Sequence, residues 1–179
     1  ITWKEDPGEA YTIGIDGYED GTKVGWYKYE RMKVLQDQYG RPTHMYFAVL
    51  DVPKKEDKGK DNHSSKNIAL PLVVERRLQI LNKERITAET KKIRVQVAAE
   101  AGFDPQADMD VQSLRFGASE EVDYGRGSSV LRTKKKGKDL ILIFEGKANG
   151  ITDRNFAGKL LGKTVEGKLL FGYASIPDH

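Results

Sequence analysis

The stretch that decides the fold class is "SVLRTKKKGKDLILIFEG", residues 129–146. Two runs rich in aliphatic and β-branched residues flank "KKKGK", a short polar segment with a single glycine. This arrangement is typical of a β-hairpin, in which a glycine-containing loop joins two antiparallel strands. The stretch therefore predicts two paired strands in the second half of the chain.

Similar segments occur on both sides of this hairpin. In "KIRVQVAAE" (92–100) the apolar residues alternate with polar ones, which places Ile93, Val95 and Val97 on one face of a strand. "SLRFGA" (113–118) is a further short strand, and "FAGKLLGKT" (156–164) and "KLLFGYASI" (168–176) flank the turn "VEG". Short strands at near-regular spacing predict a β-sandwich over residues 86–179.

The first half predicts a second β-region over residues 1–85. Its arms 24–37 and 43–51 flank "QYGRP", which is turn chemistry, and they predict another hairpin. Both faces of the second arm are largely apolar, so we expect it to be covered on both sides. The charged segment 53–67 predicts a loop, and Leu70-Pro71 after it predicts an edge strand. Residues 76–85 favour a further strand, and residues 86–90 are expected to be a linker.

Composition excludes several classes of protein. The 179 residues carry a formal net charge of +3, and neither half is strongly basic, so we expect no nucleic-acid partner. No run of about 18 apolar residues exists, so we expect no membrane span. The absence of cysteine excludes disulfides, cysteine-based zinc sites and thiol catalysis. We expect a chain that begins at Ile1 to be a processed or excised piece.

Three aspartates, Asp104, Asp108 and Asp110, raise the question of a metal site. Their spacing does not fit an EF-hand, because Pro105 interrupts it and no glycine follows until Gly117. A looser calcium site with Asp123 or Asp139 stays open as an alternative. The favoured interpretation is that Asp104-Pro105 begins a turn and the other two carboxylates are solvated, so no metal and no cofactor is predicted.

The candidate catalytic residues lie in "DKGKDNHSSKN", residues 57–67. His63 can act as a general acid or base near neutral pH, and Lys66 can neutralise the carboxylate of an acidic sugar. The alternative is a solvated turn in which Asp61 and Ser64 hydrogen-bond to local backbone. His44 is expected to be structural.

Aromatic residues gather in the first half of the chain and supply candidate substrate contacts. Exposed aromatic rings can stack on sugar rings, and Trp26, Tyr29 and Tyr46 are the candidates for this role. The alternative is that these rings pack in the core or on the sheet surface, as strand-spaced aromatics commonly do.

Residues 91–177 resemble a β-sandwich module of secreted bacterial multidomain proteins. The resemblance rests on "AGFDPQADMDVQSLRFGASEEV", "GKDLILIFE" and "GITDRNFAGKLLGKTVEGKLLFGYASI". It implies an immunoglobulin-like accessory domain without a catalytic role, at 86–179. Family members often carry an acidic turn before the "DL" strand, but here that turn is "TKKKGKD", whose ammonium groups would repel a calcium ion.

Residues 11–82 resemble the last blade region of secreted bacterial proteins built on the bacterial neuraminidase repeat, a β-propeller. The resemblance rests on "YKYERMKVLQDQYGRPTHMYFAVLDV" and "DNHSSKNIALPL". It implies an all-β chain in which a partial propeller-blade-like antiparallel sheet precedes the immunoglobulin-like sandwich. A propeller needs about four or more blades, and 85 residues supply one or two.

The two resemblances together imply a function. They suggest the C-terminal portion of a secreted or periplasmic polysaccharide-processing protein, sialidase-like or lyase-like, that is incomplete as an enzyme on its own. Its expected partners are a polysaccharide or glycan and the remainder of its own polypeptide. The alternative is a non-catalytic carbohydrate-binding or structural β-sandwich module.

Overall fold

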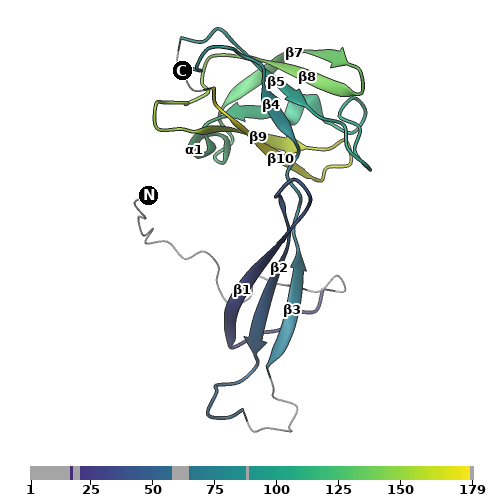
Figure 1. The fold of residues 1–179 in the computed structure, drawn as a ribbon, viewed down its shortest axis with the longest axis vertical. Helices are drawn as coiled ribbons and strands as arrows, with labels where there is room; N and C mark the ends of the chain where they lie inside the picture. The colour runs from purple at the N-terminus through teal and green to yellow at the C-terminus, as the bar shows by residue number, and fades with distance from the viewer. Residues whose placement is uncertain (1–16, 18–20, 58–64, 88, 178–179) are drawn as a thin grey trace. The chain divides into compact units, whose positions relative to one another are not determined.

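The computed structural model describes residues 17, 21–57, 65–87 and 89–177 and is all-β, with antiparallel strand pairing throughout its sheets. The chain divides into two compact units, Ile1–Val74 and Glu75–His179 (Figure 1). The division falls earlier than the expected boundary at residue 85. The reason is that β4 (Leu78–Ile80) pairs with β5 (Lys92–Val97) and therefore belongs to the second unit.

The first unit is a three-stranded antiparallel sheet in the order β1-β2-β3. Its strands are β1 (Lys28–Gln36), β2 (Pro42–Leu50) and β3 (Lys66–Pro71). The hairpin predicted from the two apolar arms is confirmed, because Tyr29 pairs with Val49 and Val34 with Met45. The predicted edge strand is confirmed as β3, where an edge position tolerates a proline that cannot donate a ladder hydrogen bond.

One face of this sheet carries a small core of Trp26, Tyr29, Phe47 and Val49. The rings of Tyr29 and Phe47 meet edge to face, with centroids 5.4 Å apart. The opposite face leaves Tyr46 39 % exposed, so the expectation that β2 is covered on both sides is wrong. A single three-stranded layer buries one face only, unless a second layer packs on the other.

The second unit contains one seven-stranded sheet in the order β10-β9-β6-β7-β8-β5-β4. Its remaining strands are β6 (Arg115–Gly117), β7 (Ser128–Lys136), β8 (Asp139–Glu145), β9 (Ala157–Lys163) and β10 (Leu169–Ser175). The hairpins predicted around "KKKGK" and "VEG" are confirmed as β7–β8 and β9–β10.

The two ends of this sheet approach each other, so the unit is nearly a closed barrel. The backbone N–H of Arg76, just before β4, donates to the carbonyl of Phe171 in β10 at 2.7 Å. Gly172 permits this approach, since a Cβ at that position would clash with the carbonyl oxygen of Arg76. An immunoglobulin-like sandwich is not confirmed by this arrangement.

The barrel interior is filled by the alternate residues of its strands. Ile93, Val95 and Val97 of β5 are fully buried, as their alternation predicted. They lie opposite Phe144, Leu142 and Leu140 of β8, and every second residue of β8 points outward. This alternation leaves the outer faces of the strands free to carry functional side chains.

Helical structure is limited to two short turns in the described residues. They are η1 (Val111–Ser113), capped by the Asp110 carboxylate, which accepts from the backbone N–H of Gln112 at 3.2 Å, and α1 (Ser119–Val122). None of the helices in the described part of the chain has the length and apolarity needed to cross a membrane.

Candidate functional site

The outer face of the β9–β10 hairpin gathers apolar and basic side chains in one strip. The register pairs Leu161 with Phe171 and Lys159 with Tyr173. Paired residues of antiparallel strands share a face, and the intervening Leu160 is in the core, so these side chains point outward. The strip continues at both ends into a hollow of the surface.

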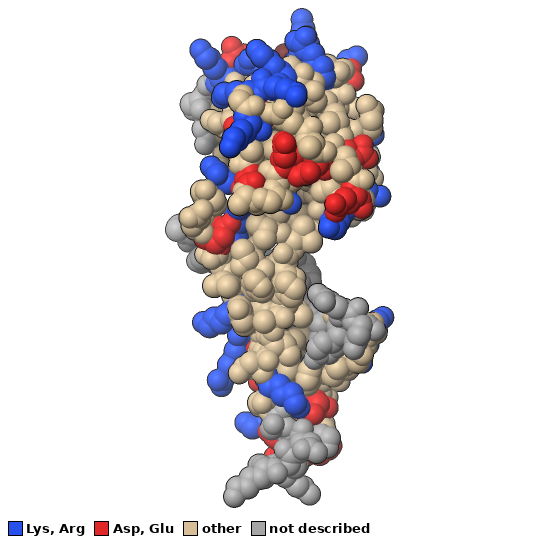
Figure 2. Space-filling model, turned by 90° about the vertical axis from the view of Figure 1, so that its right-hand side faces the viewer, with Lys and Arg blue, Asp and Glu red and all other residues tan. Residues whose placement is uncertain are grey.

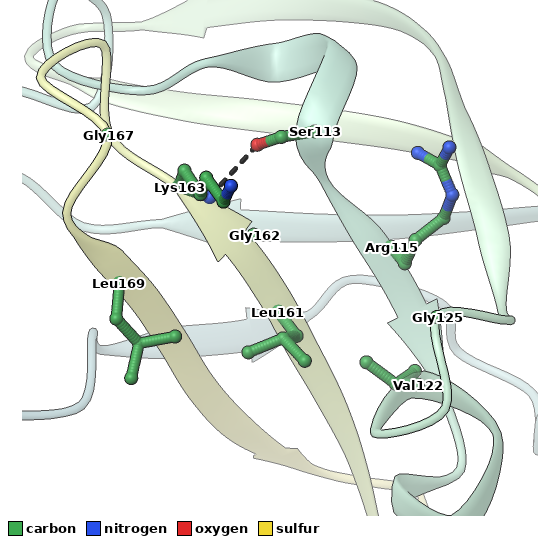
Figure 3. Close-up of a pocket in the computed structure, with 9 residues that line it drawn as sticks. All are labelled: Ser113, Arg115, Val122, Gly125, Leu161, Gly162, Lys163, Gly167 and Leu169. Atoms are coloured by element: carbon green, nitrogen blue, oxygen red, sulfur yellow. Dashed lines mark hydrogen bonds between the residues drawn. The ribbon is translucent and has the colours of Figure 1, made fainter.

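The first hollow has a volume of about 420 Å³ and an apolar floor. Figure 3 shows Leu169, Leu161 and Val122 in a row, contributed by β10, β9 and α1, with Arg115 beyond them on β6. The guanidinium of Arg115 donates to the carbonyls of Leu114 at 2.8 Å and Gln112 at 3.1 Å, which fixes its position.

A hydrogen bond between a side chain and the backbone joins η1 to β9 at the rim of this hollow. The backbone N–H of Lys163 donates to the Ser113 hydroxyl oxygen at 2.9 Å (Figure 3). Gly162 lies between them, and a Cβ there would press on the side chains of Ser113 and Leu114. The absence of a side chain at Gly162 therefore lets β9 and η1 approach each other at this hollow.

The second hollow, at the other end of the strip, has a similar volume of about 420 Å³ and carries two exposed aromatic rings. Phe156 is 85 % exposed and Tyr173 is 43 % exposed. Arg154 and Asn155 also line the hollow, and the Asn155 amide donates to the Glu120 carboxylate at 3.1 Å. The backbone carbonyl of Phe156 accepts from Ile176 N–H at 2.9 Å, so the exposed ring is anchored through its main chain.

Lys159 lies on the strip between the two hollows. Its ammonium forms an ion pair with Asp123 and lies 5.5 Å from the centre of the Tyr173 ring. Burial opposes the charged form, but hydrogen bonds with Asp123 and Tyr173 outweigh it and raise the pKa of Lys159 above its ordinary value. Lys159 therefore stays protonated at neutral pH and places a fixed positive charge beside an aromatic ring.

The chemistry of the strip suits a ligand that has both apolar faces and many hydroxyl groups. Aromatic and aliphatic side chains contact the C–H faces of such a ligand, and guanidinium, ammonium and amide groups hydrogen-bond to its rim. Within the described residues, no three His, Asp or Glu side chains lie close enough together to hold a metal ion.

The five aspartates considered as calcium ligands have separate roles. The Asp108 carboxylate accepts from the backbone N–H of Asp104, and the Asp110 carboxylate accepts from the backbone N–H of Gln112. The predicted turn at Asp104 is confirmed, because the Asp104 carbonyl accepts from the backbone N–H of Asp108. Their carboxylates are therefore bonded within the loop, contrary to the expectation that they are simply solvated. Asp123 pairs with Lys159, and Asp139 accepts from Gln96 and from Ala99 N–H.

Of the two predicted catalytic residues, His63 lies outside the described residues. Lys66 begins β3, and its ammonium forms an ion pair with Asp51 at 3.1 Å. The same ammonium lies 5.5 Å from the centre of the Trp26 ring. In the described part of the chain, Lys66 thus takes part in packing contacts of the first unit.

The three aromatics predicted to bind substrate differ in their surroundings. Trp26 is 5 % exposed and Tyr29 is 9 % exposed, so both belong to the core and neither ring offers a face for stacking on a sugar. This corrects the assignment for those two residues in favour of the packing alternative. Tyr46 remains on the surface, with its ring 6.2 Å from that of His44.

Sequence reasoning missed Phe156, Tyr173 and Arg154. A signal was present for Tyr173, because "KLLFGYASI" alternates after Leu170 and every second residue of such a strand must face outward. The outward-facing residues of this strand include Phe171 and Tyr173, which form an aromatic strip outside the core.

Comparison of the chain with models of protein families, with curated proteins and with solved structures returns no match.

Proposed function

We propose that the barrel unit is a non-catalytic carbohydrate-binding module of a polysaccharide-processing protein. The observation that carries the proposal is the outward strip of β9–β10, which ends in the hollow of Phe156 and Tyr173. The Phe156 ring is 85 % exposed while its main chain is fixed next to the start of β9, so it presents a ring face on which a sugar ring can stack.

The polar groups around the two rings support a hydroxyl-rich ligand. The Arg154 guanidinium makes no hydrogen bond or ion pair with other described residues, so its donors are open to a ligand. Asn155 and Glu120 form a hydrogen-bonded pair at the same hollow and can exchange partners with sugar hydroxyls. A pyranose ring has C–H faces that can stack on the aromatic rings and hydroxyl groups that can hydrogen-bond to the guanidinium, amide and carboxylate groups.

Binding measurements on the full chain test this proposal. Calorimetry against a panel of neutral and acidic polysaccharides is expected to find at least one ligand, and Phe156→Ala is expected to weaken its binding about tenfold. The matched control is Tyr27→Ala, which removes a 52 % exposed ring from the first unit and should leave affinity unchanged. Absence of binding to the whole panel, or equal losses in both variants, overturns the proposal.

We further propose that the first unit is part of a larger β-propeller sheet, so that the chain is the C-terminal portion of a secreted or periplasmic sialidase-like or lyase-like protein. What supports this is the incomplete layer: β1 exposes Met32 (42 %), Val34 (43 %) and Leu35 (49 %). A propeller blade has four strands, and the described residues of this unit form three. The kinship of the barrel with immunoglobulin-like accessory modules belongs to the same proposal.

Enzyme assays test this second candidate. The protein with the remainder of its polypeptide is to be assayed on acidic and sulfated polysaccharides, alongside His63→Ala. Loss of turnover in the variant without loss of folding supports a role for His63 as acid or base. Unchanged turnover removes His63 from the mechanism.

A further inference from the structure

The barrel has a second distinctive face, on the outside of β5, β8 and β7. Ile141 and Ile143 lie on the outer face of β8, because their neighbours Leu140, Leu142 and Phe144 are in the core, and Ile143 is itself covered, with 7 % of its surface exposed. The register places Arg94 of β5 and Arg132 of β7 on either side of Ile143. It likewise places Gln96 and Lys134 on either side of Ile141.

Positive charge accumulates on this face towards the β7–β8 turn. In the next row of the strand register Lys136 lies opposite Asp139, and Lys138 lies in the turn itself. Residues two apart on a strand are about 7 Å from one another, and neighbouring strands are about 4.8 Å apart, so the cations form a grid. Figure 2 shows many Lys and Arg side chains at the upper end of the view, which belongs to the barrel unit.

The four cations of this grid form no ion pair with an acidic side chain in the described part of the chain. Arg132 and Lys134 form no ion pair with any described residue, and Lys136 donates to the Gln96 amide oxygen at 2.8 Å, which is a neutral partner. Arg94 donates to the carbonyl of Leu81 at 3.1 Å. Asp139, which lies opposite Lys136 at the turn end of this face, accepts from the Gln96 amide and from the backbone N–H of Ala99.

Three cations elsewhere on the same unit do have acidic partners. Lys159 pairs with Asp123, Arg126 with Glu121 and Lys168 with Glu166. Like charges on adjacent strands repel one another, so a grid of unpaired cations lowers stability unless an anion binds there. The chain as a whole has a net charge of only +3, so this concentration is local.

We propose that the outer face of β5–β8–β7, defined by Arg94, Arg132, Lys134 and Lys136, binds a chain of repeating anionic groups, namely an acidic polysaccharide. The proposal rests on the proposed carbohydrate-binding function and names its substrate class. A single-stranded nucleic acid fits less well, because proteins hold its bases on aromatic rings, and the outward side chains of β8 between the cations are isoleucines.

Affinity measurements on the full chain test this assignment, with dextran sulfate as the polyanion and unsulfated dextran as its neutral counterpart. The variant Arg132→Gln/Lys134→Gln is expected to bind dextran sulfate about tenfold more weakly. The slope of log affinity against log salt should also fall by about one to two, because two fewer counterions are released. The matched control is Lys54→Gln/Lys55→Gln, which removes the same charge from exposed positions of the first unit and should stay within about twofold of the wild type.

Each outcome decides between the alternatives. Equal losses in the two double variants mean that net charge alone attracts the polyanion, and they overturn the assignment of this face. Tighter binding of a single-stranded oligonucleotide than of dextran sulfate at equal ionic strength overturns the substrate class. If Phe156→Ala abolishes binding of a neutral sugar while both double variants bind dextran sulfate normally, the proposed function stands and this inference fails.

Discussion

Asp104 and Asp108 bond to each other twice across one loop. The backbone N–H of Asp104 donates to the Asp108 carboxylate at 2.7 Å, and the backbone N–H of Asp108 donates to the Asp104 carbonyl at 2.8 Å. The Asp104 carboxylate in turn accepts from Gln106 N–H at 2.8 Å. Carboxylate oxygens that satisfy the backbone of their own loop stabilise a turn, which is the role that Asp-Pro sequences commonly have.

The first prediction follows from this reciprocal contact. Asp108→Ala leaves the N–H of Asp104 without its acceptor and is expected to lower the free energy of unfolding by about 1 kcal/mol. Asp108→Asn keeps a side-chain oxygen acceptor and should recover most of that loss. Chemical denaturation of the two variants and the wild type measures both effects.

Calcium provides the control for the same loop. If the loop is a turn, millimolar calcium leaves the unfolding temperature of the wild type unchanged, since a ligand stabilises only the state that binds it. A rise of several degrees that disappears in Asp108→Asn would instead show a calcium site, and would contradict the turn interpretation.

A second prediction concerns the close approach of backbone at Gly146. A Cβ at this position would overlap the carbonyl oxygen of Thr90, and the Gly146 N–H donates to the carbonyl of Lys91 at 3.0 Å. Gly146→Ala must therefore displace a main-chain segment, and we expect it to lower the free energy of unfolding by more than about 2 kcal/mol. Gly25→Ala, whose Cβ would meet no atom within 4 Å, is the control and should change it little.

The strands of this chain are largely predictable from sequence, whereas their closure is not. The alternation of apolar and polar residues identifies which side chains of β5 are buried. Turn residues identify the hairpins β1–β2, β7–β8 and β9–β10, because both signals are local in the sequence. The contact between Arg76 and Phe171 joins residues nearly a whole unit apart, and no local pattern specifies it. A sandwich and a nearly closed barrel therefore share the same sequence signature.

The candidate site was less predictable because aromatic residues serve both core and surface. Trp26 and Phe156 are both large aromatic residues next to glycine-containing segments, yet one is 5 % and the other 85 % exposed. Trp26 belongs to a packed cluster with Phe47. Which ring is buried depends on tertiary packing, which composition and spacing do not contain.

The third prediction tests the buried amide of Asn149. This side chain is 2 % exposed, donates to the carbonyl of Gly146 at 2.5 Å and accepts from Ile151 N–H at 2.7 Å. Asn149→Ala leaves both backbone groups without their partner in a buried place, so we expect a loss of about 2–4 kcal/mol in the free energy of unfolding. Asn67→Ala, at an exposed position of β3, should cost little, and equal losses in the two variants would refute the role assigned to Asn149.

The last prediction concerns the pH dependence of the β1–β2 hairpin. The Asp37 carboxylate accepts from the backbone N–H groups of Tyr39 and Arg41 at 2.8 and 3.0 Å and pairs with the Arg41 guanidinium at 2.7 Å. Partial desolvation acts to raise the pKa of Asp37, but these hydrogen bonds outweigh it and hold the pKa below its ordinary value of 3.8.

A carboxyl group whose pKa is lower in the folded state contributes stability that is fully present above its unfolded pKa. That contribution is lost as pH falls through the folded value. The wild type should therefore be more stable than Asp37→Asn at pH 6, and the difference should shrink as the pH is lowered below 3.8. Urea unfolding followed by tryptophan fluorescence measures this, because Trp26 is buried in the same unit. Asp153→Asn, at an exposed position of the barrel, is the control, and a difference between wild type and Asp37→Asn that persists undiminished at low pH would contradict the role of the Asp37 charge.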